Sequence, residues 1–164
     1  MEQKAFIGIG SNIGDSTKNC TASIIKLTED KRVRLISRSF FYVTSPVSAI
    51  EQKDFINCVV CIIWAGSPFD LLELLNSIEE IMGRSRGDKN GPRTIDLDIL
   101  LFGDLVLNSP SLKIPHPELH KRKFAIIPCI EIEPAIIHPV YGRQLKEFLA
   151  DIGDEQKIEK LESL

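Results

Sequence analysis

Apolar residues in the first two thirds of the chain are grouped into runs that predict alternating strands and helices. Four runs are rich in β-branched and aromatic residues, which favours strands at 5–9, 34–44, 55–64 and 95–102. After the first run, Cys20, Ile24 and Leu27 recur at helical spacing behind Asp15, a helix-capping residue type. A second helix precedes the last run. This order predicts a ferredoxin-like βαββαβ sandwich of the α+β class.

The second predicted helix has clear start and stop signals. Ser67 is in the capping position, Pro68 takes the first helical position, and Asp70 completes a capping box. Gly83 marks the end of the helix. Leucine and isoleucine residues form the apolar stripe of this helix, and Glu79 lies at the edge of that stripe.

The last third of the chain has weaker signals. A hairpin is expected at residues 103–104, and the prolines that follow residue 115 divide the sequence into short helices. Additional C-terminal strands and helices are therefore expected beside the sandwich. The acidic stretch 147–162 is typical of a solvated helix. Because no linker or repeat interrupts the chain, residues 1–164 are expected to form a single domain.

Charge and composition exclude several classes of protein. The net charge of −3 gives no general attraction to nucleic acid. No segment reaches the ~18 uninterrupted apolar residues of a membrane helix, and the N-terminus lacks a signal-peptide pattern. We therefore expect a cytoplasmic protein without nucleic-acid or membrane partners, and a monomer is the simplest expectation. In that compartment, free thiols are expected at Cys20, Cys58, Cys61 and Cys129.

A pair of carboxylates lies on the last predicted strand of the sandwich. Asp96 and Asp98 are two residues apart, so they share one strand face about 6.6 Å apart. Flanked by apolar residues, two negative charges at this spacing repel each other unless a proton or a cation intervenes. Magnesium suits the second case, because it binds one or two carboxylates and fills its shell with water and substrate phosphates. A polar strand face that only meets water is the alternative.

Basic residues come directly before this aspartate pair. Arg84, Arg86, Lys89 and Arg93 all fall between residues 84 and 93. Guanidinium groups bind phosphate oxygens and stabilise the charge that develops during phosphoryl transfer. The arginines are therefore candidates for work on a metal-bound polyphosphate, although a solvated basic loop is the simpler interpretation of the charges alone.

The segment KNGPRTIDLDIL, residues 89–100, closely resembles the signature of the 6-hydroxymethyl-7,8-dihydropterin pyrophosphokinase family of folate biosynthesis. Further segments resemble the family in the same order, namely residues 8–12, 41–46, 55–57, 78–86, 115–117 and 122–124. The likeness spans residues 5 to about 140. Several motifs in one order make the resemblance more specific than any one of them.

The resemblance implies an activity and its catalytic residues. Members of the family transfer the β,γ-diphosphate of ATP to the hydroxymethyl group of a reduced pterin and release AMP. By this likeness, Asp96 and Asp98 hold two Mg²⁺ ions, and Asp98 orients or deprotonates the pterin hydroxyl. Arg84 and Arg93 match the arginines that assist the transfer. The residues that match positions around ATP are Glu79, Arg86, Lys89, Ile99, His116 and Arg122.

The pterin partner needs a different set of side chains. A flat heterocycle with an amide-like edge favours aromatic faces and a side-chain amide. Phe55 and Phe124 match the faces, and Asn57, on the same strand face as Phe55, matches the edge. Thr44 and Val47 would offer backbone groups. Without the family likeness, the two phenylalanines would be read as core residues.

Two other functions remain compatible with these residues. Another magnesium-dependent nucleotidyltransferase or a phosphohydrolase would also use paired aspartates and arginines. A non-catalytic module that binds a nucleotide or a pterin is the third possibility. The products distinguish them, because AMP together with a pterin diphosphate cannot come from hydrolysis.

Overall fold

The computed structural model describes residues 1–45, 52–83 and 94–161, which are built around one antiparallel sheet. The sheet order is β5-β1-β4-β3-β8, and β2 pairs with the same strand β4 as β3 does. Its strands are β1 Glu2–Ser11, β2 Val33–Arg38, β3 Tyr42–Thr44, β4 Phe55–Ala65, β5 Asp96–Phe102 and β8 Ile158–Lys160. With β2 and β3 counted as one strand, this is the ferredoxin-like order that the sequence predicts.

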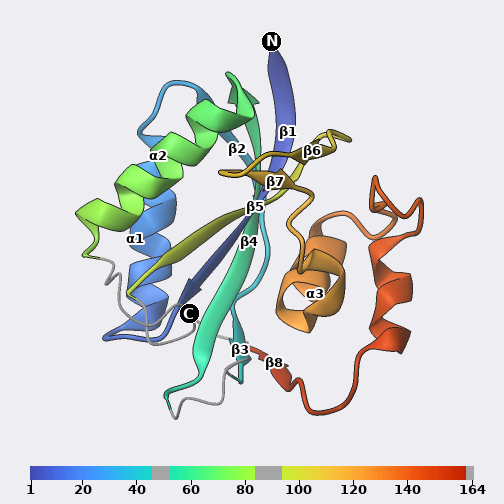
Figure 1. Ribbon diagram of the computed structural model, residues 1–164. Helices are drawn as coiled ribbons and strands as arrows, with labels where there is room; N and C mark the ends of the chain where they lie inside the picture. Colours follow the sequence, from blue (N-terminus) through green and yellow to red (C-terminus); the bar gives the residue numbers. More distant parts are fainter. Residues whose placement is uncertain (46–51, 84–93, 162–164) are drawn as a thin grey trace.

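Helices cover both faces of the sheet (Figure 1). The two predicted helices, α1 Ser16–Thr28 and α2 Pro68–Ile81, lie side by side on one face. The opposite face carries α3 Lys123–Ile132 and two 3-10 helices, η1 Leu119–Lys121 and η2 Leu145–Asp151. The α+β class is confirmed, and the C-terminal region adds a third layer.

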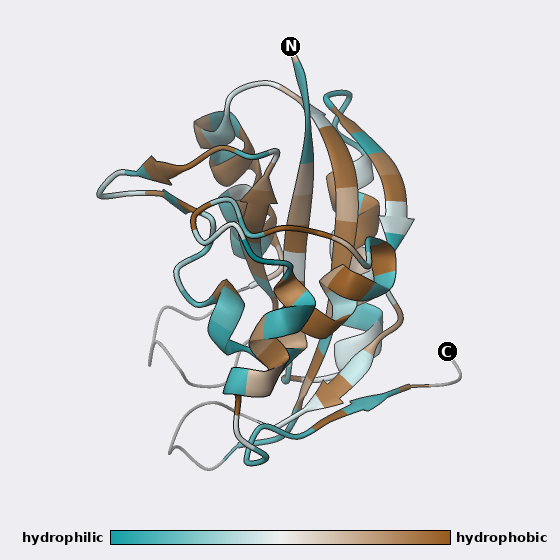
Figure 2. Cartoon of the chain, turned by 90° about the vertical axis from the view of Figure 1, so that its right-hand side faces the viewer, coloured by the Kyte–Doolittle hydropathy of each residue, from teal (hydrophilic) through white to brown (hydrophobic). Residues whose placement is uncertain are grey.

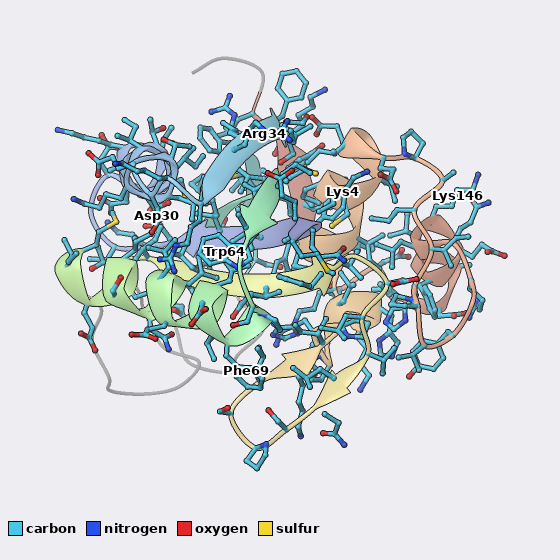
Figure 3. The ribbon with its side chains drawn as sticks, turned by 90° about the horizontal axis from the view of Figure 1, so that it is seen from above. Lys4, Asp30, Arg34, Trp64, Phe69 and Lys146 are labelled. Atoms are coloured by element: carbon cyan, nitrogen blue, oxygen red, sulfur yellow. The ribbon has the colours of Figure 1, made fainter. Side chains whose placement is uncertain are left out.

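Alternation along the strands produces a separate core on each face. Ala5, Ile7 and Ile9 of β1 join the core beneath α1 and α2, whereas Phe6 joins the core beneath α3. Hydrophobic segments follow the central strands, and polar segments lie on the outer turns (Figure 2). Trp64 is fully buried between the sheet and α2 (Figure 3), and its indole Nε1 donates to the carbonyl of Ser67 at 2.9 Å.

Both predicted helix starts are confirmed. The side chain of Asp15 accepts from the backbone N–H of Lys18, and that of Ser67 accepts from the N–H of Asp70. Cys20, like Ile24 and Leu27, is buried on the inner face of α1. None of the helices in the described ranges is long and apolar enough to cross a bilayer.

The strand predicted over 34–44 is wrong in one respect, because it is divided into β2 and β3. Ser39 lies at the break: its N–H donates to the carbonyl of Val59, and its hydroxyl accepts from the N–H of Val59. A side chain thus replaces a ladder bond, and the register against β4 also shifts between Leu35 and Ser37. Phe41 is consequently buried, while Phe40 is exposed.

The C-terminal expectations need three corrections. Residues 103–104 form a turn, but the hairpin that follows pairs β6 Leu107–Asn108 with β7 Lys113–Ile114. Pro128 lies inside α3 rather than at its end, since burial of the helix against the sheet compensates for one lost backbone bond. Within the expected helix 147–162, the described residues 147–161 do not form one α-helix: they hold the end of η2 and then β8, which pairs with β3.

Two histidines lie in an aromatic cluster of the C-terminal layer. His120 and His138 have ring centroids 5.6 Å apart, and both rings contact Phe148 and Tyr141. Nδ1 of His138 accepts from the N–H of Val140, and the residue is 3% exposed. Burial lowers the pKa of His138 to about 4, and the neighbouring His120 lowers it too.

This burial predicts an acid-sensitive free energy of unfolding. An unfolded histidine has a pKa near 6.5, whereas the pKa of His138 in the folded chain is about 4. Between these two pH values, the unfolded chain therefore binds a proton at this residue and the folded chain does not. The contribution of His138 to the free energy of unfolding is therefore fully present above pH 6.5, and it decreases as the pH falls from 6.5 to about 4. We expect His138 to account for about 2 kcal/mol between about pH 7.5 and about pH 5.

Urea denaturation of the wild type and of His138→Gln at both pH values measures this contribution. The wild type should lose about 2 kcal/mol more than the variant. The same loss in both proteins would show that His138 is not the group that responds.

Candidate active site

A cavity opens on the α3 face of the sheet, across the strands β5, β1 and β4. Its floor contains Gly8 and Gly10 of β1, and its rim includes residues from β3, η1 and α3. The lining residues that the sequence singled out are Thr44, Phe55, Asn57, Asp96, Asp98, His116, Arg122 and Phe124. Side chains from both halves of the chain thus meet in one place.

The two aspartates face this cavity together, as their spacing predicts. Both are partly exposed, while Leu97 between them is buried in the core on the other face. Leu101 departs from the alternation of a regular strand, because the register with β1 shifts beside it and turns it to the α3 side with Leu100. The shift lies beyond the aspartates and leaves their common face intact.

The strand register explains why the glycines form the floor. Gly10 pairs with Asn57 on β4 and with Asp96 on β5, and Gly8 pairs with Asp98 on β5. A side chain at Gly10 would meet the Asn57 amide, whereas one at Gly8 would meet the side chain of Leu100. Glycine leaves that space open, which gives the Gly8–Gly10 segment a structural role that the sequence alone did not reveal.

A hydrogen bond fixes the side-chain amide of Asn57. Its Nδ2 donates to Oγ1 of Thr44 at 2.6 Å, and the residue is 7% exposed. Its Oδ1 lies over Gly10, where an added Cβ would approach that oxygen to 2.6 Å. The donor end of the amide is therefore anchored, and the acceptor oxygen is held above the glycine floor.

Aromatic and basic side chains complete the cavity. Phe55 and Phe124 both line it, from β4 and α3 respectively. The guanidinium of Arg122 lies over the Phe124 ring at 5.5 Å. This places Arg122 beside the aromatic part of the cavity as well as near His116.

A second cavity lies at the outer edge of β5 and adjoins the first. Asp98 and His116 line both cavities, whereas Ile99, Ser111 and Leu112 line only the second. Two substrates could therefore occupy separate cavities and meet at Asp98. Ile99 and His116, which were predicted from the family likeness, are brought together here.

The ring of His116 is oriented by a backbone contact, and its surroundings disfavour the charged form. Burial lowers its pKa, and the positive charge of Arg122 lowers it further against the opposing effect of Asp96. Its Nδ1 accepts from the N–H of Glu118 at 3.0 Å, so the ring proton lies on Nε2. The imidazole can therefore donate to an acceptor such as a phosphate oxygen.

Glu79 is buried and contacts β5. It is 4% exposed, and its Oε2 accepts from the N–H of Leu97 at 2.8 Å. The edge position predicted on α2 thus corresponds to a carboxylate directed at the strand that bears the aspartates.

The donor set at the aspartates fits magnesium better than a transition metal. In the part of the chain that the structure describes, no three His, Cys, Asp or Glu side chains cluster as metal ligands. Two partly exposed carboxylates facing one cavity suit a hard cation that retains water and takes phosphate oxygens. The predicted residues Val47, Arg84, Arg86, Lys89 and Arg93 lie outside the described residues.

Comparison with known proteins identifies relatives over most of the chain. The model of the 7,8-dihydro-6-hydroxymethylpterin-pyrophosphokinase family matches residues 6–134. The 2-amino-4-hydroxy-6-hydroxymethyldihydropteridine pyrophosphokinase of Aquifex aeolicus is 40% identical over 143 residues, which cover 87% of this chain and 88% of the relative. The enzyme of the same name from Pseudomonas aeruginosa is 36% identical, with 92% of each chain covered.

A solved structure supports the fold. Wild-type Plasmodium falciparum HPPK-DHPS superposes with a TM-score of 0.72 over 92% of this chain at 14% identity, a level at which the likeness concerns the fold alone. This chain spans 45% of that longer chain. Together with the family match, the relatives lead to one conclusion: the chain belongs to the 7,8-dihydro-6-hydroxymethylpterin-pyrophosphokinase family.

Proposed function

We propose that the chain transfers the β,γ-diphosphate of ATP to the hydroxyl of 6-hydroxymethyl-7,8-dihydropterin, with Asp96 and Asp98 at the point of transfer. Family membership supports the reaction. One observation supports the assignment to these residues: both aspartates face a cavity that adjoins a second one at Asp98. Two substrates bound in the two cavities would present their reacting groups to the same carboxylates.

The first cavity is the pterin site in this proposal. Phe55 and Phe124 supply apolar ring faces, and Asn57 supplies the polar edge. Because Thr44 holds Nδ2, the anchored Oδ1 accepts from an N–H of the pterin. Thr44 and Val47 add backbone contacts. Hydrogen-bond directions would thus select a pterin over an apolar ring of the same size.

The second cavity takes the nucleotide. Ile99 offers an apolar surface to the adenine, and His116 donates from Nε2 to a phosphate oxygen. Arg122, at the border of the pterin cavity, reaches toward the same phosphates. Arg86 and Lys89 are assigned to ATP from the family signature alone, and so are Arg84 and Arg93 to the transfer.

The reaction needs one proton acceptor and one leaving group. The pterin hydroxyl oxygen forms a bond to the β-phosphorus, the bond from that phosphorus to the α–β bridging oxygen breaks, and AMP leaves with that oxygen. Asp98 orients the hydroxyl and accepts its proton. Asp96, on the same strand face, would hold the cation together with Asp98. Magnesium, with two ions expected, supplies positive charge against the phosphate oxygens when bound.

We also propose a domain organisation, an oligomeric state and a cellular location for the protein. The whole chain acts as one domain, which the pairing of β8 with β3 supports, and it acts as a monomer. Its four cysteines are buried free thiols, which supports a cytoplasmic location.

Product analysis tests this function. The protein is incubated with ATP, Mg²⁺ and the hydroxymethyl dihydropterin, and the products are separated by chromatography. We expect AMP and the pterin diphosphate in equal amounts. ADP with phosphate would indicate a phosphohydrolase, nucleotide attached to the pterin would indicate a nucleotidyltransferase, and binding without any product would indicate a non-catalytic module.

A further inference from the structure

The strand that carries the aspartates is an edge strand of the sheet. Among the residues that the structure describes, β5 pairs with β1 on one side only, in the register Asp96 with Gly10 and Asp98 with Gly8. Backbone groups of successive residues in a strand point to opposite edges, so the N–H of Leu97, between the aspartates, points away from β1. Glu79 of α2 accepts that N–H at 2.8 Å.

Burial makes this contact costly to lose. Glu79 is 4% exposed, and Leu97 is 5% exposed. A carboxylate removed from water needs compensating hydrogen bonds, and a buried N–H without an acceptor is also unfavourable. An apolar side chain at position 79 would continue the apolar stripe of α2, in which Leu75 and Ile78 are buried. The hydrogen bond to the N–H of Leu97 therefore accounts for a carboxylate at position 79.

The held N–H lies in the backbone between the two aspartates. The N–H of Leu97 belongs to the peptide plane that joins Asp96 to Leu97, so fixing its direction limits rotation of the backbone between Asp96 and Asp98. Two carboxylate ligands bind a cation more tightly when their spacing is already fixed before the cation binds. An outer hydrogen bond to the ligand-bearing backbone provides that restraint without touching the ion.

We propose that Glu79 is a positioning residue that acts through the Leu97 peptide to keep Asp96 and Asp98 in one arrangement for cation and triphosphate binding. The inference rests on the proposed function for its substrates, but not for its geometry. It gives Glu79 a hydrogen-bonding role distinct from a direct contact with ATP.

Three variants separate hydrogen bonding from charge. Glu79→Gln keeps an acceptor oxygen and removes the charge, whereas Glu79→Leu removes both at similar size. Glu80→Gln removes a carboxylate from the next, exposed position of α2 and is the matched control. Each protein is titrated with Mn²⁺ in the presence of a non-hydrolysable ATP analogue, and amide exchange along β5 is followed by NMR.

We expect Glu79→Leu to weaken Mn²⁺ binding by about 10-fold or more and to speed exchange of the Leu97 amide. Glu79→Gln and Glu80→Gln should stay within about 3-fold of the wild type, since each keeps the acceptor to Leu97. Equal losses in Glu79→Gln and Glu79→Leu would overturn the proposal in favour of a purely electrostatic role. Wild-type affinity in a folded Glu79→Leu protein would also overturn it.

The role of Glu79 can still be tested if the leucine variant does not fold or if the proposed reaction is not observed. In the wild type, the Leu97 amide must be protected from exchange, and its proton resonance must shift in Glu79→Gln more than those of the other β5 amides. A rapidly exchanging Leu97 amide in the wild type overturns the proposal. If product analysis finds no diphosphoryl transfer, the exchange and Mn²⁺ measurements still report on Glu79 directly.

Discussion

Replacing Asp98 with Asn is expected to lower kcat by about 10³-fold or more, and Asp96→Asn should have a similar effect. Asparagine has nearly the same shape but no negative charge, so it holds a hard cation poorly and cannot accept the hydroxyl proton. The fold should remain, because both aspartates are partly exposed and neither belongs to the buried cores.

Steady-state assays of AMP release measure this effect, with circular dichroism to confirm folding. Asp104→Asn is the matched control, since Asp104 is an exposed carboxylate just beyond the end of β5. The control should retain wild-type turnover. Asp98→Asn turnover within about 10-fold of the wild type would contradict the catalytic role of the pair.

Gly10→Ala is expected to raise the KM for the pterin by about 10- to 100-fold while leaving the KM for ATP nearly unchanged. The added Cβ would approach Oδ1 of Asn57 to 2.6 Å, too close for any contact. Asn57 cannot withdraw without breaking its bond to Thr44, so either the amide turns or the strand moves. Losing one or two hydrogen bonds to a buried amide costs about 1–3 kcal/mol, which corresponds to the expected range.

Gly8→Ala provides a closely matched control on the same strand face. There the three atoms nearest to the added Cβ all belong to the side chain of Leu100, the first at 3.3 Å, and a leucine side chain can adjust by a few tenths of an ångström. Its effect on the pterin KM should stay within about 3-fold. Initial rates of both variants are measured against the pterin at saturating ATP and against ATP at saturating pterin. Equal effects of the two substitutions would show that the Asn57 amide is not what Gly10 protects.

The order of elements and the helix starts could be predicted from the sequence because their causes are local. Asp15 and Ser67 cap helices through contacts with residues three positions on, and such contacts are visible as short motifs. The shared face of Asp96 and Asp98 follows from the alternation of a strand, which needs no knowledge of neighbouring strands.

The features that sequence reasoning missed depend on contacts between distant segments. Ser39 divides a predicted strand because its hydroxyl accepts from the N–H of Val59 on β4. The acidic stretch near the C-terminus becomes β8 because β3 offers a free edge to pair with. Charge pattern alone favours a helix there, and only the assembled sheet supplies the competing hydrogen bonds.

For the site, residue types could be predicted but several of their roles could not. The glycines of the cavity floor could not be predicted because glycine has no functional side chain. Gly10 has its role because the strand register places it between Asn57 and Asp96. Glu79 was assigned from the family likeness to the surroundings of ATP, whereas its contact with Leu97 depends on how α2 crosses β5. A one-dimensional pattern contains neither relation.

Anomalous X-ray scattering from crystals grown with Mn²⁺ and a non-hydrolysable ATP analogue would test the metal-binding role of Asp96 and Asp98, because it locates the cations without reference to turnover. We expect two manganese peaks within coordination distance of the Asp96 and Asp98 carboxylates, with the analogue's phosphates completing their shells. Peaks elsewhere, or aspartate side chains turned away from the nucleotide, would contradict it.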